Sequence, residues 1–327
     1  MFFAEAPGPT EDKFTPRVRN TASILWKLYV GLTLLLILCL TITGMPLFDS
    51  VCNALSTISA GGFSPHEHSI LGYGLPSATW IITVFMIIAG TNFNLQYKIL
   101  QKKNPLLLFK DDEFKTYLGF ILFAGAILTA LLMAGEHYIN LDAIRHAFFQ
   151  IVSLMTSSGF ASADYTKWSS AGKLVLFIAI FFGSCASSAG GGIKITRWLL
   201  VCKIMKNEII KILHPNAVIP VKYNNKAVPA DVLRQIIIFI VQYFLIIAIS
   251  SVIISLLENN HVLGFTAAVT ALGNVGPAFG QIGPMGSFEN LHTATKITLI
   301  LNMLIGRLEL IPFLVMLNPE FWQIKKD

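Results

Sequence analysis

The stretch Ser59-Ala60-Gly61-Gly62-Phe63 organises this chain, because two similar stretches follow it: Thr156-Ser157-Ser158-Gly159-Phe160 and Gly273-Asn274-Val275-Gly276-Pro277. Each one comes directly after a short apolar segment and precedes a longer one. The glycines at the equivalent positions, Gly62, Gly159 and Gly276, are 97 and 117 residues apart. A spacing of this size indicates a large repeated unit.

The composition is that of a polytopic membrane protein. Hydrophobic residues make up 54% of the 327 residues and charged residues 13%, and the mean hydropathy is +0.66, which excludes an ordinary soluble globular protein. A spanning helix needs about 20 mainly apolar residues. Runs of that length lie at about 21–46, 77–100, 115–135, 172–205, 233–257 and 293–317. Shorter apolar pieces at about 49–58, 142–157 and 262–272 predict half-membrane helices.

These segments predict an all-α polytopic membrane protein with three consecutive membrane-pore-membrane repeats. After an N-terminal segment 1–20, the repeats occupy 21–103, 104–214 with a broken second span, and 215–327. One short apolar segment between spans is also typical of an interfacial helix or a packed loop. Three segments in the same register favour pore helices.

Positive charge predicts the orientation of the chain. Lysine and arginine are concentrated in the connector after the first repeat and in the connector at 194–234. Because these residues favour cytoplasmic loops, we expect the glycine loops to face outward and both termini to lie inside. The net charge of +6 is then a topology signal, and it gives no reason to infer nucleic-acid binding.

The glycine loops have the composition of a cation filter. Glycine adopts backbone angles closed to other residues and leaves carbonyls free to line an ion path. The short helices would aim the negative ends of their dipoles at the loops. No acidic ring is visible, so selectivity would rest on backbone carbonyls. The predicted filter residues are Thr57, Ile58, Ser59, Ala60, Gly61, Gly62, Thr156, Ser157, Ser158, Gly159, Gly273, Asn274, Val275 and Gly276.

The span at 172–205 contains a run of small residues, Gly183-Ser184-Cys185-Ala186-Ser187-Ser188-Ala189-Gly190-Gly191-Gly192. Each glycine weakens a helix by about 0.8–1 kcal/mol relative to alanine, so we expect a break there. Close packing of small residues between spans is the alternative. The run lacks the Gly-Lys-Ser/Thr ending of a phosphate-binding loop.

Arg307 is the one titratable residue that the pattern places well inside an apolar stretch. A charge at membrane depth is a functional-site hypothesis by default. Arg307 would either pair with Glu309 or backbone carbonyls as a structural lock, or face the pore beneath the filter. Residues 307 and 309 lie on different helix faces, which disfavours a direct local pair.

The filter strings, the run from Gly183 to Lys194, and Ile305-Gly306-Arg307-Leu308-Glu309 resemble the Trk-type potassium-uptake proteins, the TrkH branch of the Trk/Ktr/HKT superfamily. The resemblance covers essentially the whole chain. Members of the family have four units around one pore, whereas this sequence shows three. The resemblance therefore implies units two to four, with the N-terminal unit absent through a fragment, a truncated gene model or a real short form.

The resemblance also implies roles for individual residues. Glycine at all three filter positions goes with a preference for potassium over sodium. Potassium would be bound at Ser59, Ala60, Ser157, Ser158, Asn274 and Val275. A gate beneath the filter would include Gly183, Ser187, Ser188, Gly190, Gly191, Gly192, Lys194 and Arg307.

Partners and location follow from the same resemblance. It implies a homodimer with one pore per protomer, a cytoplasmic nucleotide-binding regulatory subunit on the basic inner face, and a location in the bacterial inner membrane. The connector at 194–234 is the docking candidate, with a soluble linker as the alternative. We expect no enzyme activity and no cofactor, and potassium as the transported substrate. A sodium-coupled or sodium-permeable transporter and a non-conducting truncated form are the alternative functions.

Overall fold

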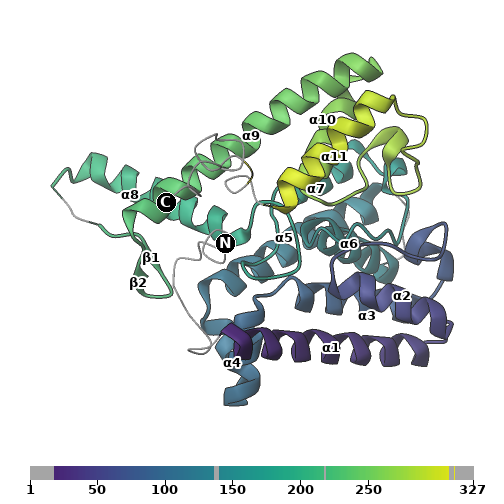
Figure 1. Ribbon diagram of the computed structural model, residues 1–327, viewed down its shortest axis with the longest axis horizontal. Helices are drawn as coiled ribbons and strands as arrows, with labels where there is room; N and C mark the ends of the chain where they lie inside the picture. The colour runs from purple at the N-terminus through teal and green to yellow at the C-terminus, as the bar shows by residue number, and fades with distance from the viewer. Residues whose placement is uncertain (1–17, 136–139, 217–218, 309–312, 314–327) are drawn as a thin grey trace, which may run out of the picture.

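The computed structural model describes residues 18–135, 140–216, 219–308 and residue 313. The described part is mostly helical (Figure 1). The first group of helices is α1 (Val18–Ile42), α2 (Leu47–Ile58), α3 (Pro76–Ala89) and α4 (Phe93–Lys102). The second is α5 (Asp112–Gly135), α6 (Asn140–Met155), α7 (Ser170–Ile180) and α8 (Ile195–Leu213). The third is α9 (Ala230–Glu258), α10 (His261–Leu272) and α11 (Thr293–Arg307).

The same order of elements occurs three times along the chain. A long helix is followed by a short helix, a glycine loop and a further helix, and each short helix packs against the long one before it (Figure 1). Among the described residues, α1, α5 and α9 are the single helices long and apolar enough to cross a membrane. The short helices α2, α6 and α10 have 12, 16 and 12 residues, so the prediction of three short helices is confirmed.

The prediction of one continuous span at 77–100 is wrong. The chain bends by 95° between α3 and α4. Polar side chains at the corner take over backbone hydrogen bonds that a continuous helix would make. The Thr91 hydroxyl donates to the Ile88 carbonyl at 2.6 Å, and the Asn92 side chain accepts from the Asn94 N–H at 2.8 Å and so caps α4.

The predicted break in the span at 172–205 is confirmed, because α7 ends at Ile180 and α8 begins at Ile195. The last predicted span, 293–317, is helical from Thr293 to Arg307. Residues 309–312 and 314–317, which complete that prediction, lie outside the described residues.

Besides the helices, the described residues include a small hairpin. The strands β1 (Lys222–Tyr223) and β2 (Lys226–Ala227) pair antiparallel. Asn224 and Asn225 join them with φ values of 47° and 64°, as a two-residue type I′ turn requires. Short 3₁₀ segments occur at Ser69–Tyr73, Pro105–Lys110, Tyr165–Lys167 and Gly280–Ile282.

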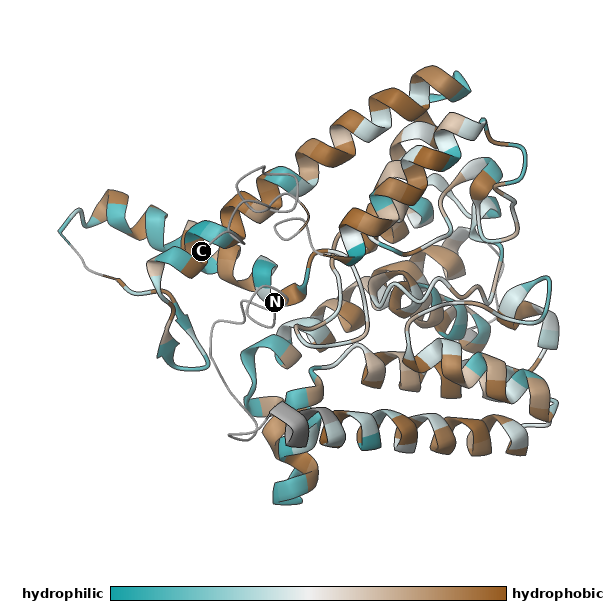
Figure 2. Ribbon diagram, in the orientation of Figure 1, coloured by the Kyte–Doolittle hydropathy of each residue, from teal (hydrophilic) through white to brown (hydrophobic). Residues whose placement is uncertain are grey.

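Hydropathy divides the molecule into bands (Figure 2). Apolar residues dominate α1, α9 and α11, whereas polar residues gather on α8, α4 and the hairpin, and on loops at the opposite end. On α9 one face is buried, with Phe239, Tyr243 and Ile247, while Val241 and Leu245 on another face are exposed. An exposed apolar band of this kind is the surface that a bilayer covers.

Candidate functional site

All three short helices end in the same backbone motif. The residues Ala60, Ser157 and Asn274 adopt left-handed conformations, with φ of 55°, 53° and 55°. In each loop the following N–H donates to the carbonyl five residues earlier. These hydrogen bonds are Gly61 to Ser56 at 2.8 Å, Ser158 to Ser153 at 2.9 Å and Val275 to Thr270 at 2.9 Å. They define a Schellman motif, which stops each helix where its loop begins.

The glycines lie two residues beyond the left-handed position. Gly62, Gly159 and Gly276 have φ values of 70°, 75° and 98°, a region that glycine adopts at little cost. The positive φ values therefore explain why glycine occupies these three positions, as the sequence predicts. The left-handed conformations of Ala60 and Ser157 were not predicted, because alanine and serine seldom adopt this conformation.

The three loops contact one another in chain order. A Cβ atom built on Gly62 would lie 1.6 Å from the Ser158 carbonyl oxygen, and one on Gly159 would lie 2.2 Å from the Val275 carbonyl oxygen. A Cβ on Gly276 would meet nothing within 4 Å among the described residues. The loops thus form a partial ring in which Gly62 and Gly159 each pack on the next loop, and within the described residues the ring is open at Gly276.

The three loops differ in how deeply they are buried. In the middle loop, Thr156, Ser157 and Ser158 are buried, whereas Ser59 and Ala60 of the first loop are partly exposed. Thr57, just before the first loop, is also buried, and its hydroxyl donates to the Asn53 carbonyl at 2.6 Å. The middle loop is therefore enclosed by its two neighbours.

The non-helical residues 181–194, here called the central loop, connect α7 to α8. Its two ends are joined, because the Gly183 N–H donates to the Ile193 carbonyl at 2.8 Å and the Ile195 N–H to the Ser184 carbonyl at 3.1 Å. Within it, the Lys194 ammonium donates to the Gly190 carbonyl. The Ser184 and Ser188 hydroxyls are hydrogen-bonded at 2.7 Å, and Ser187 and Gly192 have φ of 52° and 70°.

The central loop lies against the middle and third glycine loops. The Gly191 N–H donates to the Ser157 hydroxyl. A Cβ on Gly190 would be 2.7 Å from the Thr156 carbonyl oxygen, and one on Gly191 would be 2.6 Å from the Gly273 carbonyl oxygen. Glycine is needed at both positions because the two backbones touch.

Hydrogen bonds from the first group of helices hold the central loop. The Cys185 N–H donates to the Gly90 carbonyl at 2.9 Å, and the Phe93 N–H donates to the Ser187 carbonyl at 3.2 Å. Both contacts come from the corner between α3 and α4. The bend that contradicts the predicted 77–100 span therefore serves to anchor the central loop.

Arg307 is the last residue of α11 rather than a mid-helix residue. Its guanidinium donates to the Ala189 carbonyl of the central loop at 3.2 Å. This hydrogen bond places Arg307 beside the glycine run, and its partner there is a backbone carbonyl. The alternative partner Glu309 lies outside the described residues.

Two buried charges were missed by the sequence analysis. Glu113, in the first turn of α5, is 1% exposed and accepts a hydrogen bond from the Ala186 N–H at 2.6 Å. Arg197 is 8% exposed and stacks 3.8 Å above the ring of Phe239. Glu113 follows two other acidic residues, and Arg197 lies in the basic connector at 194–234, so no local signal marks either as buried.

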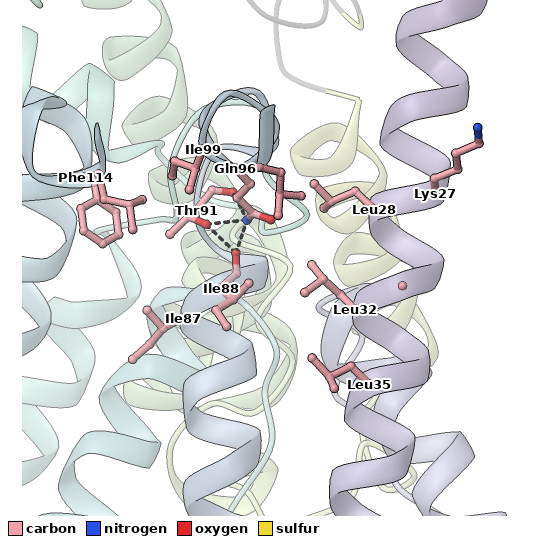
Figure 3. Close-up of a pocket in the computed structure, with 13 residues that line it drawn as sticks. Lys27, Leu28, Leu32, Leu35, Ile87, Ile88, Thr91, Gln96, Ile99 and Phe114 are labelled. Carbon is pink, nitrogen blue, oxygen red and sulfur yellow. Dashed lines mark hydrogen bonds between the residues drawn. The ribbon is translucent and has the colours of Figure 1, made fainter. Parts of the chain in front are cut away.

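A cavity of about 490 Å³ lies apart from the glycine loops, between α1, α3, α4 and the start of α5 (Figure 3). Its walls are mainly apolar, and Lys27 points away from it. The polar groups at one end bond each other, since the Gln96 amide donates to the Ile88 carbonyl at 2.6 Å and to the Thr91 hydroxyl at 2.5 Å. This cavity lacks the converging oxygen atoms of an ion path.

Comparisons with known proteins show the family of the chain. The sequence profile of TrkH, described as a cation transport protein, matches residues 4–324. The chain is 35% identical to the Trk system potassium uptake protein TrkH of Salmonella typhimurium over 99% of its own length and 67% of that protein's. It is 31% identical to the Trk system potassium uptake protein TrkG of Escherichia coli, with 99% and 66% covered.

A solved structure also matches. The crystal structure of the potassium transporter TrkH from Vibrio parahaemolyticus is similar with a TM-score of 0.88 and 31% identity, covering 94% of this chain and 66% of that one. The chain thus spans about two thirds of the length of the relatives it matches. The chain belongs to the TrkH family of cation transport proteins, a family of membrane transporters rather than enzymes.

Proposed function

We propose that this chain forms three sides of a potassium-selective path across the cytoplasmic membrane. The observation that carries the proposal is the partial ring, in which Gly62 and Gly159 each pack against a carbonyl of the next loop. Backbone carbonyls held close together in this way are the groups that replace the hydration shell of potassium. The relatives named above are potassium uptake proteins.

The electrostatics of the loops favour a cation. Each loop follows the C-terminal end of a short helix, where the helix dipole is negative. The candidate filter positions carry uncharged residues, so the transported ion would be bound by backbone oxygens. We assign potassium to the loop positions Ser59, Ala60, Ser157, Ser158, Asn274 and Val275.

The central loop is the proposed gate. Its backbone is packed against Thr156 and Gly273 at the ends of two short helices, so an ion leaving the filter on that side meets it. Lys194 and Arg307 bring positive charge to the same loop, which would lower cation occupancy while the loop is in place. Displacement of the loop would then permit flow.

The three groups of helices are proposed to be membrane-pore-membrane units at 21–103, 104–214 and 215–327, equivalent to units two to four of a four-unit pore. The open side at Gly276 is the place where a further loop would complete the ring. By the same resemblance, the protein is a homodimer in a bacterial inner membrane with cytoplasmic termini. The regulatory nucleotide-binding subunit of the Trk system would dock on α8 and the hairpin.

Uptake of potassium, rubidium and sodium tests this function. The chain is joined to the N-terminal pore unit of a relative and produced in cells that lack potassium uptake. We expect uptake of potassium and rubidium over sodium, and a lower potassium preference in Gly159→Ser. Equal sodium uptake by the unaltered chain would favour the sodium-permeable alternative. Unchanged selectivity in Gly159→Ser would remove the filter assignment.

A further inference from the structure

We propose that Glu113 is a positioning residue that couples the hairpin 222–227 to the central loop, so that movement of the hairpin changes the position of the loop. The coupling concerns two segments of this chain, the hairpin and the central loop. Its consequence for ion flow rests on the proposed gating function, whereas the coupling itself does not.

The two oxygens of the Glu113 carboxylate bind different segments. Oε1 accepts the N–H of Ala186 in the central loop at 2.6 Å, and it also accepts the hydroxyl of Thr196 at the start of α8. Oε2 accepts the hydroxyl of Tyr223 in β1 at 3.3 Å. One side chain therefore joins the loop, the helix that follows it and the hairpin.

The hairpin is held to the start of α5 by further contacts. The Asn224 side-chain oxygen accepts the Asp112 N–H at 2.8 Å, and its amide donates to the Asp111 carboxylate at 2.7 Å. The Lys203 ammonium binds the Asp112 carboxylate at 2.9 Å and the Lys222 carbonyl at 2.8 Å. These contacts fix the hairpin against the N-terminal start of α5, from which Glu113 projects.

The hydrogen bonds of Glu113 lie in a buried part of the protein. Glu113 is 1% exposed and Tyr223 is 6% exposed, so water does not readily replace a lost partner. A buried carboxylate that loses one hydrogen bond is strongly disfavoured, and the remaining bonds of its network change with it. Withdrawal of the Tyr223 hydroxyl would therefore disturb the bond between Glu113 and the central loop.

The chain contains its own reporter for the loop. Cys185 is 1% exposed and lies beside Ala186, the residue whose N–H binds Glu113. The other three cysteines, Cys39, Cys52 and Cys202, are replaced by serine, so that N-ethylmaleimide reports on Cys185 alone. The labelling rate measures how often the loop leaves its packed position, independently of ion flow.

Tyr223→Phe is the main variant, because it removes the hydroxyl and keeps a ring in the cluster with Leu200 and Ile236. Glu113→Gln and Glu113→Ala test the carboxylate itself. Asn207→Ala is the matched control. The Asn207 amide donates to the Ile219 carbonyl at 3.2 Å and so ties the segment before the hairpin to α8 without contacting Glu113.

We expect Tyr223→Phe to raise the labelling rate of Cys185 about two- to tenfold, the change in population expected from the loss of one hydrogen bond. Glu113→Ala should raise it further, and Asn207→Ala should leave it unchanged. Size-exclusion chromatography checks that each variant is folded. An unchanged rate in Tyr223→Phe and in folded Glu113→Gln would overturn the coupling, as would an equal rise in Asn207→Ala.

Potassium uptake by the same variants, measured in the four-unit fusion, separates this inference from the proposed function. Faster labelling of Cys185 with unchanged uptake would support the coupling and contradict the gate assignment. Unchanged labelling, together with higher uptake in Arg307→Ala, would support the gate and contradict the coupling.

Discussion

The packing of Gly159 on the third loop leads to a prediction that is specific to the partial ring. In Gly159→Ala, the added Cβ would lie 2.2 Å from the Val275 carbonyl oxygen and 3.0 Å from Cδ of Pro277. Carbon and oxygen atoms that contact each other are usually about 3.3–3.6 Å apart. The third loop must therefore move by about 1 Å, or the two loops must separate.

Two costs combine in this variant. A residue with a Cβ in the left-handed region costs about 1–2 kcal/mol relative to glycine, and overpacking of a close contact costs about 1–3 kcal/mol more. Gly276→Ala is the matched control, because Gly276 also has a positive φ, 98°, but a Cβ there meets nothing within 4 Å among the described residues. We therefore expect Gly159→Ala to be less stable than Gly276→Ala by about 1–3 kcal/mol.

The assay is thermal unfolding of the two purified variants in the same detergent, alongside the unaltered chain. Gly159→Ala should unfold at a clearly lower temperature than Gly276→Ala. In the four-unit fusion, where a further loop would lie against Gly276, the two variants should become similarly unstable. Equal stability of the two variants in the present chain would refute the interlocked arrangement of the loops.

Three further outcomes are expected. Arg307→Ala should raise potassium uptake by the four-unit fusion by up to roughly tenfold, because the lost hydrogen bond to Ala189 is worth about 0.5–1.5 kcal/mol. Arg307→Lys should raise uptake less. Lower uptake by a normally folded Arg307→Ala would indicate a structural role. Asn302→Ala, which leaves the buried Ser250 hydroxyl without its 2.9 Å partner, should lower stability in thermal unfolding by about 0.6–2 kcal/mol. Burial raises the pKa of the Tyr223 phenol, and the charge of Glu113 raises it further. The hairpin should therefore stay bound to Glu113 below the ordinary tyrosine pKa of about 10 and loosen above it. Faster limited proteolysis at high pH would detect the loosening.

Local chemistry explains what was predictable. The lengths of the apolar segments predicted α1, α5 and α9 as spans and α2, α6 and α10 as short helices. The glycine run predicted the break between α7 and α8. Each of these features depends on residues that are close together in the chain, because helix length and glycine content act over a few turns.

Other features depend on a few polar residues whose local effect is small. The corner between α3 and α4 rests on Thr91 and Asn92, which either continue or end a helix according to their surroundings. The left-handed residues that end the short helices include Ala60 and Ser157, neither of which is typical of that position. Sequence patterns describe average behaviour, and these positions depart from it.

The sequence by itself determined that the chain carries three equivalent glycine loops in an apolar, multi-helix protein, since composition and spacing are local properties. Only the tertiary structure decided that Gly62 and Gly159 pack on neighbouring carbonyls while no described residue packs on Gly276. It also decided that Glu113, among three consecutive acidic residues, is the buried one. These contacts join residues about a hundred positions apart. Their existence depends on how whole helices pack, which no short window of sequence records.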